Sequence, residues 1–403
     1  MKLAATKLVA YLKENNLRRS HFAAQIDVQP STITRLLNGE RDQPSPQIMY
    51  KIEEATGGAV RMQDWVVEEP RRDPTATRPR VGLLGVGWIG RHRLQAILQA
   101  GAVEVAAIAD ASLEMVAEAG SLAPEAALVS SLDELLAAEV DGVVIATPSA
   151  MHAEQSIRAL ERGAAVFCQK PLGRTAAEVR AVIEAARAAD RLLAVDLSYR
   201  FTEGMRRIRD LVRAGELGRV YAVDLVFHNA YGPDKPWFYD PVLSGGGCVM
   251  DLGVHLVDLA LWVLDFPAVE DVSAKLFAGG EPLRPQPDRV EDYAVATLAL
   301  ATGAVVQLAS SWRLQAGCDA VISAAFYGSG GGAALRNVNG SFYDFTAERY
   351  RGTARETLAS PPDAWFGRAA ADWAARLAAG ARFDPTAERL VDVAEVLDRI
   401  YGR

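Results

Sequence analysis

The sequence predicts an α/β protein in three parts: a small all-α module, a doubly wound parallel sheet and a second α/β unit. Residues 1–68 contain short helical patterns. In residues 80–198, apolar strands alternate with Ala-rich helices, which is the order of a parallel sheet covered on both faces. In residues 199–403, strand-like runs with turn signals lead to two terminal helices. Residues 69–79 are charged and proline-containing and lack apolar periodicity, so we expect a linker there.

The composition fits globular domains and excludes several classes of protein. Half of the 403 residues are apolar and 23% are charged, which is enough for buried cores. The net charge of -8 argues against a surface devoted to nucleic acid. The apolar run 254–264 is too short to cross a membrane and contains two polar residues, so a membrane span is not expected. Lysines interrupt the first apolar residues of the chain, so a signal peptide is not expected either. Three widely separated cysteines indicate reduced thiols, so we expect a cytoplasmic protein.

The first module is predicted to contain helices at about 3–15, 19–25, 29–38 and 46–56, with Ser20 capping the second. The stretch 22–39 resembles the Cro/repressor-type helix-turn-helix family. Asp27 stands where that family usually has the glycine of the turn, and aspartate tolerates the left-handed backbone at some cost.

The resemblance implies that the second helix of the motif enters the major groove of DNA. The residues that it would present to bases or phosphates are Gln29, Ser31, Thr32 and Arg35. The alternative is a helical bundle that mediates protein contacts. The charge of residues 1–65 favours this alternative. The segment contains nine Lys and Arg and seven Asp and Glu, and this small positive charge would give only weak affinity for DNA.

A glycine motif follows the first strand of the α/β region. The strand 80–84 runs into GVGWIG, in which Gly85, Gly87 and Gly90 form GxGxxG before a helix. The first glycine permits the tight turn, the second lets the backbone approach a pyrophosphate, and the third allows close helix–strand packing. Trp88 and Ile89, inside the motif, are expected to contact the same dinucleotide.

The acidic residue that ends the second strand points to NAD. Strand 103–109 leads to Asp110, twenty residues after Gly90. A carboxylate there suits the ribose hydroxyls of adenosine and repels the 2′-phosphate of NADP. The next residue is Ala111, so no arginine follows Asp110 to bind that phosphate. We therefore expect NAD rather than NADP, although Asp110 could instead cap the helix that begins near Ser112.

Two further apolar runs, 142–146 and 164–168, are predicted to join the same sheet. Ligands of such sheets lie beyond the carboxyl ends of the strands. The side chains that follow these two strand ends, and are therefore expected at the cofactor, are Thr147, Pro148, His152, Gln169 and Lys170.

From about residue 80 onward the chain resembles the Gfo/Idh/MocA oxidoreductases. The matching landmarks, in order, are Ala146-Thr147-Pro148 with His152, Gln169-Lys170-Pro171-Leu172, Tyr199-Arg200-Phe201, and Gly245-Gly246-Gly247 with Asp251, Gly253 and His255. The resemblance implies a Rossmann domain and a larger α/β domain on an open, mostly antiparallel sheet. It implies hydride transfer between a nicotinamide and a secondary alcohol of a sugar or cyclitol. It also implies a homodimer or homotetramer through the outer face of that sheet.

Hydride removal from an alcohol needs a base for the proton and a positive group for the developing alkoxide. By resemblance, His255 is the acid/base, Lys170 the electrostatic and proton-relay partner, and Asp251 the anchor for a substrate hydroxyl. Asp251 and His255 are four apart in a predicted helix and should share one face. Arg200 and Trp237 are further expected substrate contacts. Asp251 and His255 could instead form a local hydrogen-bonded pair or be two ligands of a metal ion. No third ligand is suggested nearby, so no metal is expected.

One departure from the family pattern leaves the function open. The family usually has glutamate before the catalytic lysine, whereas this chain has Gln169, which keeps the shape but loses the charge. The leading hypothesis is a dehydrogenase with an appended helix-turn-helix. The alternative is a transcription regulator whose oxidoreductase-like part senses NAD or a sugar without turnover, and a third is that the first module only assists assembly. Lys170, Asp251 and His255 favour the enzyme.

Overall fold

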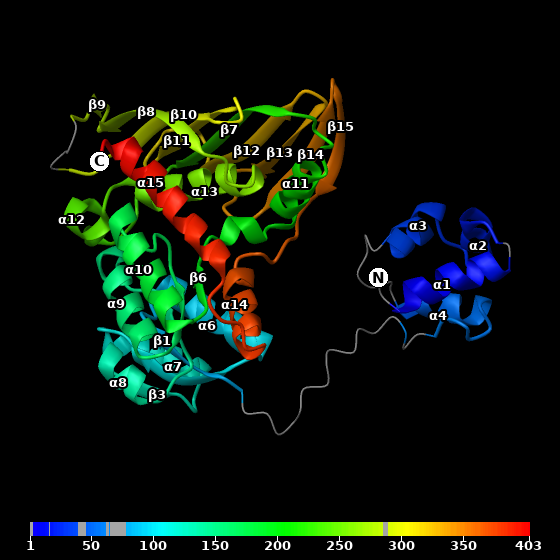
Figure 1. Cartoon of the computed structure of the whole chain (residues 1–403), viewed down its shortest axis with the longest axis horizontal. Helices are drawn as coiled ribbons and strands as arrows, with labels where there is room; N and C mark the ends of the chain where they lie inside the picture. The colour runs from blue at the N-terminus through cyan, green and yellow to red at the C-terminus, as the bar shows by residue number, and fades with distance from the viewer. Residues whose placement is uncertain (1–2, 16, 39–45, 62–63, 65–77, 285–288) are drawn as a thin grey trace. The chain divides into compact units, whose positions relative to one another are not determined.

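The computed structural model describes residues 3–15, 17–38, 46–61, 64, 78–284 and 289–403 (Figure 1). The chain divides into two compact units, Met1–Thr77 and Arg78–Arg403. The division falls within the segment that the sequence predicts as a linker, and residues 69–77 of that segment lie outside the described residues.

The first unit is helical. Its helices in the described residues are α1 (Leu3–Glu14), α2 (Arg19–Gln25), α3 (Pro30–Asn38) and α4 (Pro46–Ala55). Phe22, Ile33 and Leu36 are buried in its core, as the sequence predicts for a helix-turn-helix. Asp27 adopts a left-handed φ of 51° at the turn. Helix α2 spans the predicted residues, but the predicted cap at Ser20 is wrong, because the N-cap is Arg18, two residues earlier, and no side chain caps the helix.

The expected DNA-contacting residues are only partly described. Gln29 is exposed and Thr32 is half-buried at the start of α3. The side chains of Ser31 and Arg35 lie outside the described residues.

The second unit begins with a six-stranded parallel sheet, here sheet A. Its strands are β1 (Arg80–Leu84), β2 (Glu104–Ala109), β3 (Ala127–Val129), β4 (Gly142–Ile145), β5 (Ala165–Cys168) and β6 (Leu193–Val195). The order β3-β2-β1-β4-β5-β6 reverses between β1 and β4, as in a doubly wound Rossmann sheet. The connecting helices are α6 (Trp88–Ala100), α7 (Leu113–Leu122), α8 (Leu132–Ala137), α9 (Ser149–Glu161) and α10 (Ala176–Ala189).

Sheet A also receives a helix from late in the chain. Helix α14 (Arg368–Ala378) packs against α6, and its fully buried Trp373 lies 5.9 Å from Phe167, ring centroid to centroid. Residues beyond 199 therefore complete the core of the Rossmann sheet.

The rest of the unit is built on a nine-stranded sheet, here sheet B. Its strands are β7 (Val220–Asn229), β8 (Val269–Ala278), β9 (Glu281–Pro282), β10 (Tyr293–Leu300), β11 (Val305–Ser311), β12 (Ala320–Gly328), β13 (Gly331–Asn337), β14 (Phe345–Arg351) and β15 (Ala354–Ala359). The order is β15-β14-β13-β12-β7-β11-β10-β8-β9, and every pair is antiparallel except β7 with β11. The expected open, mostly antiparallel sheet is therefore confirmed.

Helices cover one face of sheet B and lie between it and sheet A (Figure 1). They are α11 (Glu203–Arg213), α13 (Val254–Val263) and α15 (Arg389–Tyr401). Shorter helical turns are η1 (Ser198–Phe201), η2 (Pro236–Tyr239), α12 (Pro241–Ser244), η3 (Val249–Gly253) and η4 (Pro385–Glu388). Among the described residues, the stretch Pro241–Val263 is long and apolar enough to span a membrane, but 89% of its most apolar window is buried inside the protein, as in a core helix.

Candidate active site

The glycine loop after β1 is shaped by close packing at two positions and is open at the third. Gly85 has a φ of 85°, and a Cβ on Gly90 would lie 2.1 Å from the carbonyl oxygen of Gly85. A Cβ on Gly87 would have no protein atom within 4 Å. Gly87 is also the N-cap of α6 and offers no side chain to its backbone N–H groups. The loop and helix end thus form an uncapped anion-binding cradle.

Asp110, at the end of β2, is tied to this loop. Its Oδ2 accepts a hydrogen bond from the backbone N–H of Val86 at 2.7 Å, and Oδ1 accepts from that of Ser112 at 2.9 Å. Ser112, not Asp110, caps α7. The carboxylate therefore holds the glycine loop in place beside the position expected for the adenosine ribose.

His152 joins the ends of β4 and β5. Its ring nitrogens lie 2.6 Å from the carbonyl oxygen of Pro171 and 2.7 Å from that of Thr147. The pKa of His152 lies below that of an ordinary histidine, mainly because the ring is buried. The neutral ring carries one N–H, so it donates to one of these carbonyls at a time. His152 therefore ties the segments that follow the two strands together.

Lys170 and Asp251 meet across the gap between sheet A and η3. Nζ of Lys170 lies 2.7 Å from Oδ1 of Asp251 and 2.6 Å from its carbonyl oxygen. Nε1 of Trp312 donates to Oδ2 at 3.0 Å. The two charged side chains are only 18% and 17% exposed, so little water screens the pair. This geometry brings together two of the three predicted catalytic residues.

His255 and Asp251 line two adjoining spaces of the site. Asp251 is in the π-helical turn η3, whereas His255 is in α13, which follows it directly. His255 lines a cavity of about 190 Å³, and Asp251 lines a cleft of about 470 Å³. Lys170 borders both spaces. Lys170 therefore lies between the spaces that the two residues line, and the expectation that Asp251 and His255 share one face stays a prediction.

His255 is well placed to be neutral. Burial lowers its pKa well below the ordinary value, and the charges of Lys170 and Arg93 lower it further. Its Nδ1 is buried without a hydrogen-bond partner in the described structure. The ring packs edge-on against Tyr199 at 4.9 Å between centroids.

The three glycines before η3 serve packing. A Cβ on Gly246 would lie 2.0 Å from Oη of Tyr401, and one on Gly247 would lie 1.9 Å from the carbonyl oxygen of Glu291. The buried carboxylate of Glu291 accepts from the N–H groups of Gly247 and Val249. Close packing against Tyr401 and Glu291 therefore requires glycine at positions 246 and 247.

The cleft of about 470 Å³ runs from the glycine loop to the aromatic turn η2. It collects the predicted residues Gly87, Trp88, Ile89, Thr147, Pro148, His152, Gln169, Lys170, Trp237 and Asp251. Trp237 stacks on Phe238 with ring centroids 3.8 Å apart. The sequence reasoning missed Asn229, Ser244 and Met250, which also line the cleft, and no local pattern marks them.

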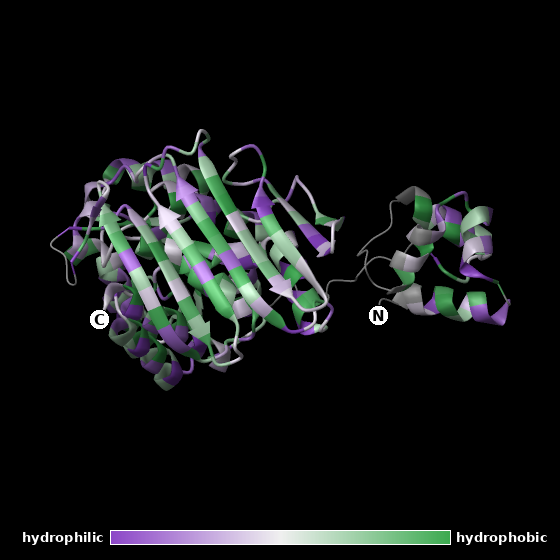
Figure 2. Ribbon diagram, turned by 90° about the horizontal axis from the view of Figure 1, so that it is seen from above, coloured by the Kyte–Doolittle hydropathy of each residue, from purple (hydrophilic) through white to green (hydrophobic). Residues whose placement is uncertain are grey.

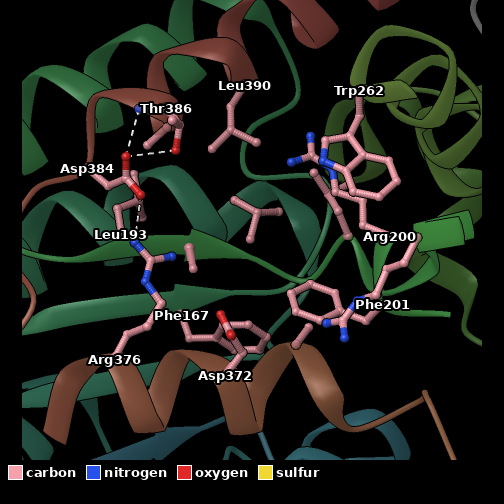
Figure 3. Close-up of a pocket in the computed structure, with 16 residues that line it drawn as sticks. Phe167, Leu193, Arg200, Phe201, Trp262, Asp372, Arg376, Asp384, Thr386 and Leu390 are labelled. Carbon is pink, nitrogen blue, oxygen red and sulfur yellow. Dashed lines mark hydrogen bonds and ion pairs between the residues drawn. The ribbon is translucent and has the colours of Figure 1, made fainter. Parts of the chain in front are cut away.

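Arg200 lies elsewhere. Its Nε donates to Oδ2 of the buried Asp258 at 2.8 Å, and Nη2 bonds the other carboxylate oxygen. Arg200 borders a separate cavity of about 220 Å³ between β6 and the terminal helices, shown in Figure 3 with Trp262 and Asp384 among its walls. The prediction that Arg200 contacts the substrate is therefore corrected, because Asp258 holds its guanidinium away from the cleft.

Comparison with known sequences agrees with this architecture. Residues 79–197 match the family described as "Oxidoreductase family, NAD-binding Rossmann fold", residues 205–334 match "GFO/IDH/MocA C-terminal domain", and residues 8–61 match "Helix-turn-helix". The chain is 30% identical over 277 residues to D-glucoside 3-dehydrogenase of Escherichia coli (strain K12), covering 65% of this chain and 78% of that protein. The chain belongs to the Gfo/Idh/MocA oxidoreductase family. The predicted family, fold class and NAD-binding domain are confirmed.

Other proteins are similar to this chain in sequence or in fold. Inositol 2-dehydrogenase of Acidiphilium cryptum (strain JF-5) is 32% identical over 228 residues, or 56% of this chain and 64% of that one. Among solved structures, GenD2 from gentamicin A biosynthesis in complex with NAD is 25% identical, with a TM-score of 0.68 over 82% of this chain and 95% of that one. A levoglucosan dehydrogenase with NADH and levoglucosan, 22% identical, has the same fold with a TM-score of 0.69 over 80% of this chain and 96% of that one.

The residues of this chain fit NAD, and the fit can be tested at two glycines. Gly87→Ala is expected to weaken NADH binding about tenfold or more, because its methyl group enters the open space where a pyrophosphate would approach. The thermal midpoint without cofactor should stay unchanged, since no protein atom is near. The matched change Gly90→Ala should lower that midpoint, because its Cβ meets Gly85. Fluorescence titration and thermal melts measure both, and equal NADH affinity in Gly87→Ala and the unmodified protein would contradict the cradle.

Proposed function

We propose that this oxidoreductase transfers a hydride between NAD and a secondary alcohol of a sugar or cyclitol. The observation that carries the proposal is the Lys170–Asp251 ion pair, only partly exposed, in a cleft that starts at the glycine loop. Relatives named for acting on glucosides and inositol support the substrate class. The aromatic turn with Trp237 offers a flat apolar surface for a sugar ring.

Each side chain has a task in this mechanism. Bound NAD supplies the carbon centre that accepts or returns the hydride. Asp251 accepts a hydrogen bond from a substrate hydroxyl, and Trp312 fixes its other oxygen. Lys170 places a positive charge where the alkoxide develops. His255, kept neutral by burial, takes the hydroxyl proton, with Lys170 relaying it between the two compartments.

Substrate identity is tested directly with a panel of free sugars, glycosides and inositols with NAD, followed by the absorbance of NADH. Turnover of at least one panel member supports the proposal. NADH binding without turnover of any member would favour the regulator alternative.

The helix-turn-helix unit supports a second function, DNA binding. The exposed Gln29 and the half-buried Thr32 at the start of α3 lie where the family presents residues to the groove, and Arg35 and Ser31 belong to the same proposal by sequence. The small positive balance of the unit provides little phosphate-driven affinity in a single copy. Two copies joined through the oxidoreductase part would supply the missing affinity.

Full-length protein is therefore expected to bind a paired half-site at least about tenfold more tightly than residues 1–68 alone. Arg35→Ala should weaken the complex because it removes a phosphate or base contact, and added salt should weaken it because the release of counterions from DNA is then less favourable. Genomic selection followed by gel-shift titration measures this. Recovery of no preferred sequence at low salt, with or without NAD, would rule out DNA binding and favour a role in assembly.

Oligomerisation and location complete the proposal. The outer face of sheet B carries exposed Val295 and Val305, and Figure 2 shows hydrophobic and hydrophilic residues interspersed across the strands of this sheet. These side chains support a homodimer or homotetramer through this face. The three free thiols support a location in the cytoplasm.

A further inference from the structure

Gln169 is held by a buried carboxylate. The side chain lies directly before Lys170 and is only 7% exposed, and its Nε2 donates to Oδ2 of Asp196. An ionised carboxylate accepts hydrogen bonds and donates none, so its neighbour must be the NH2 end of the amide. The carbonyl end, Oε1, is then the free end, and it accepts no hydrogen bond from the described part of the chain.

Arg93 balances the charge of Asp196. Its Nε donates to the same Oδ2, its Nη1 donates to the carbonyl oxygen of Phe366 at 2.6 Å, and its guanidinium stacks 4.3 Å from the Phe366 ring centroid. Arg93 and Asp196 are each 1% exposed. A buried ion pair tolerates the loss of neither partner, because the remaining charge is left without solvation.

Three elements of the cofactor-binding sheet meet in this cluster. Gln169 follows β5, Asp196 follows β6, and Arg93 lies one turn into α6, behind the glycine loop. The N–H of Asp196 also donates to the carbonyl oxygen of Cys168 at 2.9 Å, which ties the two strand ends together. Gln169 borders both the cleft and the cavity of His255.

We propose that Asp196 is a positioning residue for the reaction. Paired with Arg93, it holds Gln169 by Nε2 and so fixes Oε1 as an acceptor for a hydroxyl or amide donor on the nicotinamide half of the cofactor. In this chain the residue before the lysine is an amide, and the buried carboxylate beside it is at position 196. A glutamate at 169 would set two buried carboxylates against one guanidinium. The role of Asp196 in the reaction rests on the proposed function, whereas its effect on Gln169 is tested through the affinity for NADH.

A charge exchange tests the proposal in full-length protein. Gln169→Glu, Asp196→Asn and the double variant are compared by NADH titration, by thermal melts without cofactor and by turnover. Each single change is expected to raise the Kd for NADH roughly tenfold or more and to lower the midpoint by several degrees, because one buried charge is left uncompensated. In the double variant a carboxylate at 169 replaces the one at 196, so the cluster again holds one carboxylate for the guanidinium of Arg93. Its Kd should return to within about threefold of the unmodified protein.

Asp190→Asn is the matched control. It removes a carboxylate that pairs with Arg382 on the surface, where both side chains are more than half exposed, and should change neither quantity. An unmodified Kd and midpoint in Gln169→Glu would overturn the proposal. A double variant no better than Asp196→Asn would also overturn it, since Asp196 would then only neutralise Arg93. If the single variants do not fold, the double variant alone still decides, because the proposal requires it to fold and bind NADH. Absence of sugar turnover with this binding pattern intact would refute the proposed function and leave the positioning role standing.

Discussion

Replacing Lys170 by alanine is expected to lower turnover roughly 100-fold or more, the scale of a lost acid/base or charge contribution. Nζ of Lys170 contacts the carboxylate and the carbonyl oxygen of Asp251 and borders both the cleft and the cavity of His255. Its loss removes the charge beside the reacting hydroxyl and the connection between the two compartments. Steady-state rates with the best sugar of the panel measure the effect.

Two further variants separate charge from proton transfer. Lys170→Arg keeps the positive charge but does not release a proton near neutrality, so it should recover only part of the lost rate. Lys13→Ala removes an exposed lysine of α1, in the first of the two compact units, and should leave the rate unchanged. Near-normal turnover in Lys170→Ala, with NADH binding intact, would move the electrostatic role to another residue.

The elements that the sequence predicts well are those determined by local pattern. The apolar runs at 80–84, 142–146 and 164–168 became β1, β4 and β5 because strands buried on both faces need unbroken hydrophobic stretches. The glycines at 85 and 90 were predictable because their packing partners lie within the same strand–turn–helix unit or on the adjacent strand. Helix α14 was predicted as a helix, but its return to sheet A depends on contacts across the chain that no local pattern contains.

The same distinction holds within the site. Gln169 and Lys170 were nominated because they follow a strand end, and that rule would also have found Asp196, which follows β6. The partnership of Arg200 with Asp258 could not be predicted, because 58 residues separate them and an arginine beside a strand end looks equally suited to a substrate. Trp312 and Glu291 support Asp251 and its helix only through tertiary contacts.

The pH dependence of alcohol oxidation is expected to report on His255. Its neutral form is the base, and burial, Lys170 and Arg93 all lower its pKa. The value of kcat/KM for oxidation should therefore stay flat as the pH falls through about 6.5, the pKa of an ordinary histidine, and decline only below that region. A decline centred at or above pH 6.5 would assign the base role to a different group.

His255→Asn should lower the rate roughly 100-fold or more and remove the acid-side decline, because no base remains to be protonated.

The lowered pKa of His255 also affects the stability of the folded protein. Below about pH 6.5 the unfolded chain binds a proton at this position and the folded protein does not, so the free energy of unfolding falls as the pH drops toward the folded pKa. His152, also buried with a lowered pKa, contributes in the same direction. Denaturant unfolding between pH 5 and 8 should thus show a shallower loss of stability in His255→Asn than in the unmodified protein, and equal slopes would mean that His255 is not buried in its neutral form.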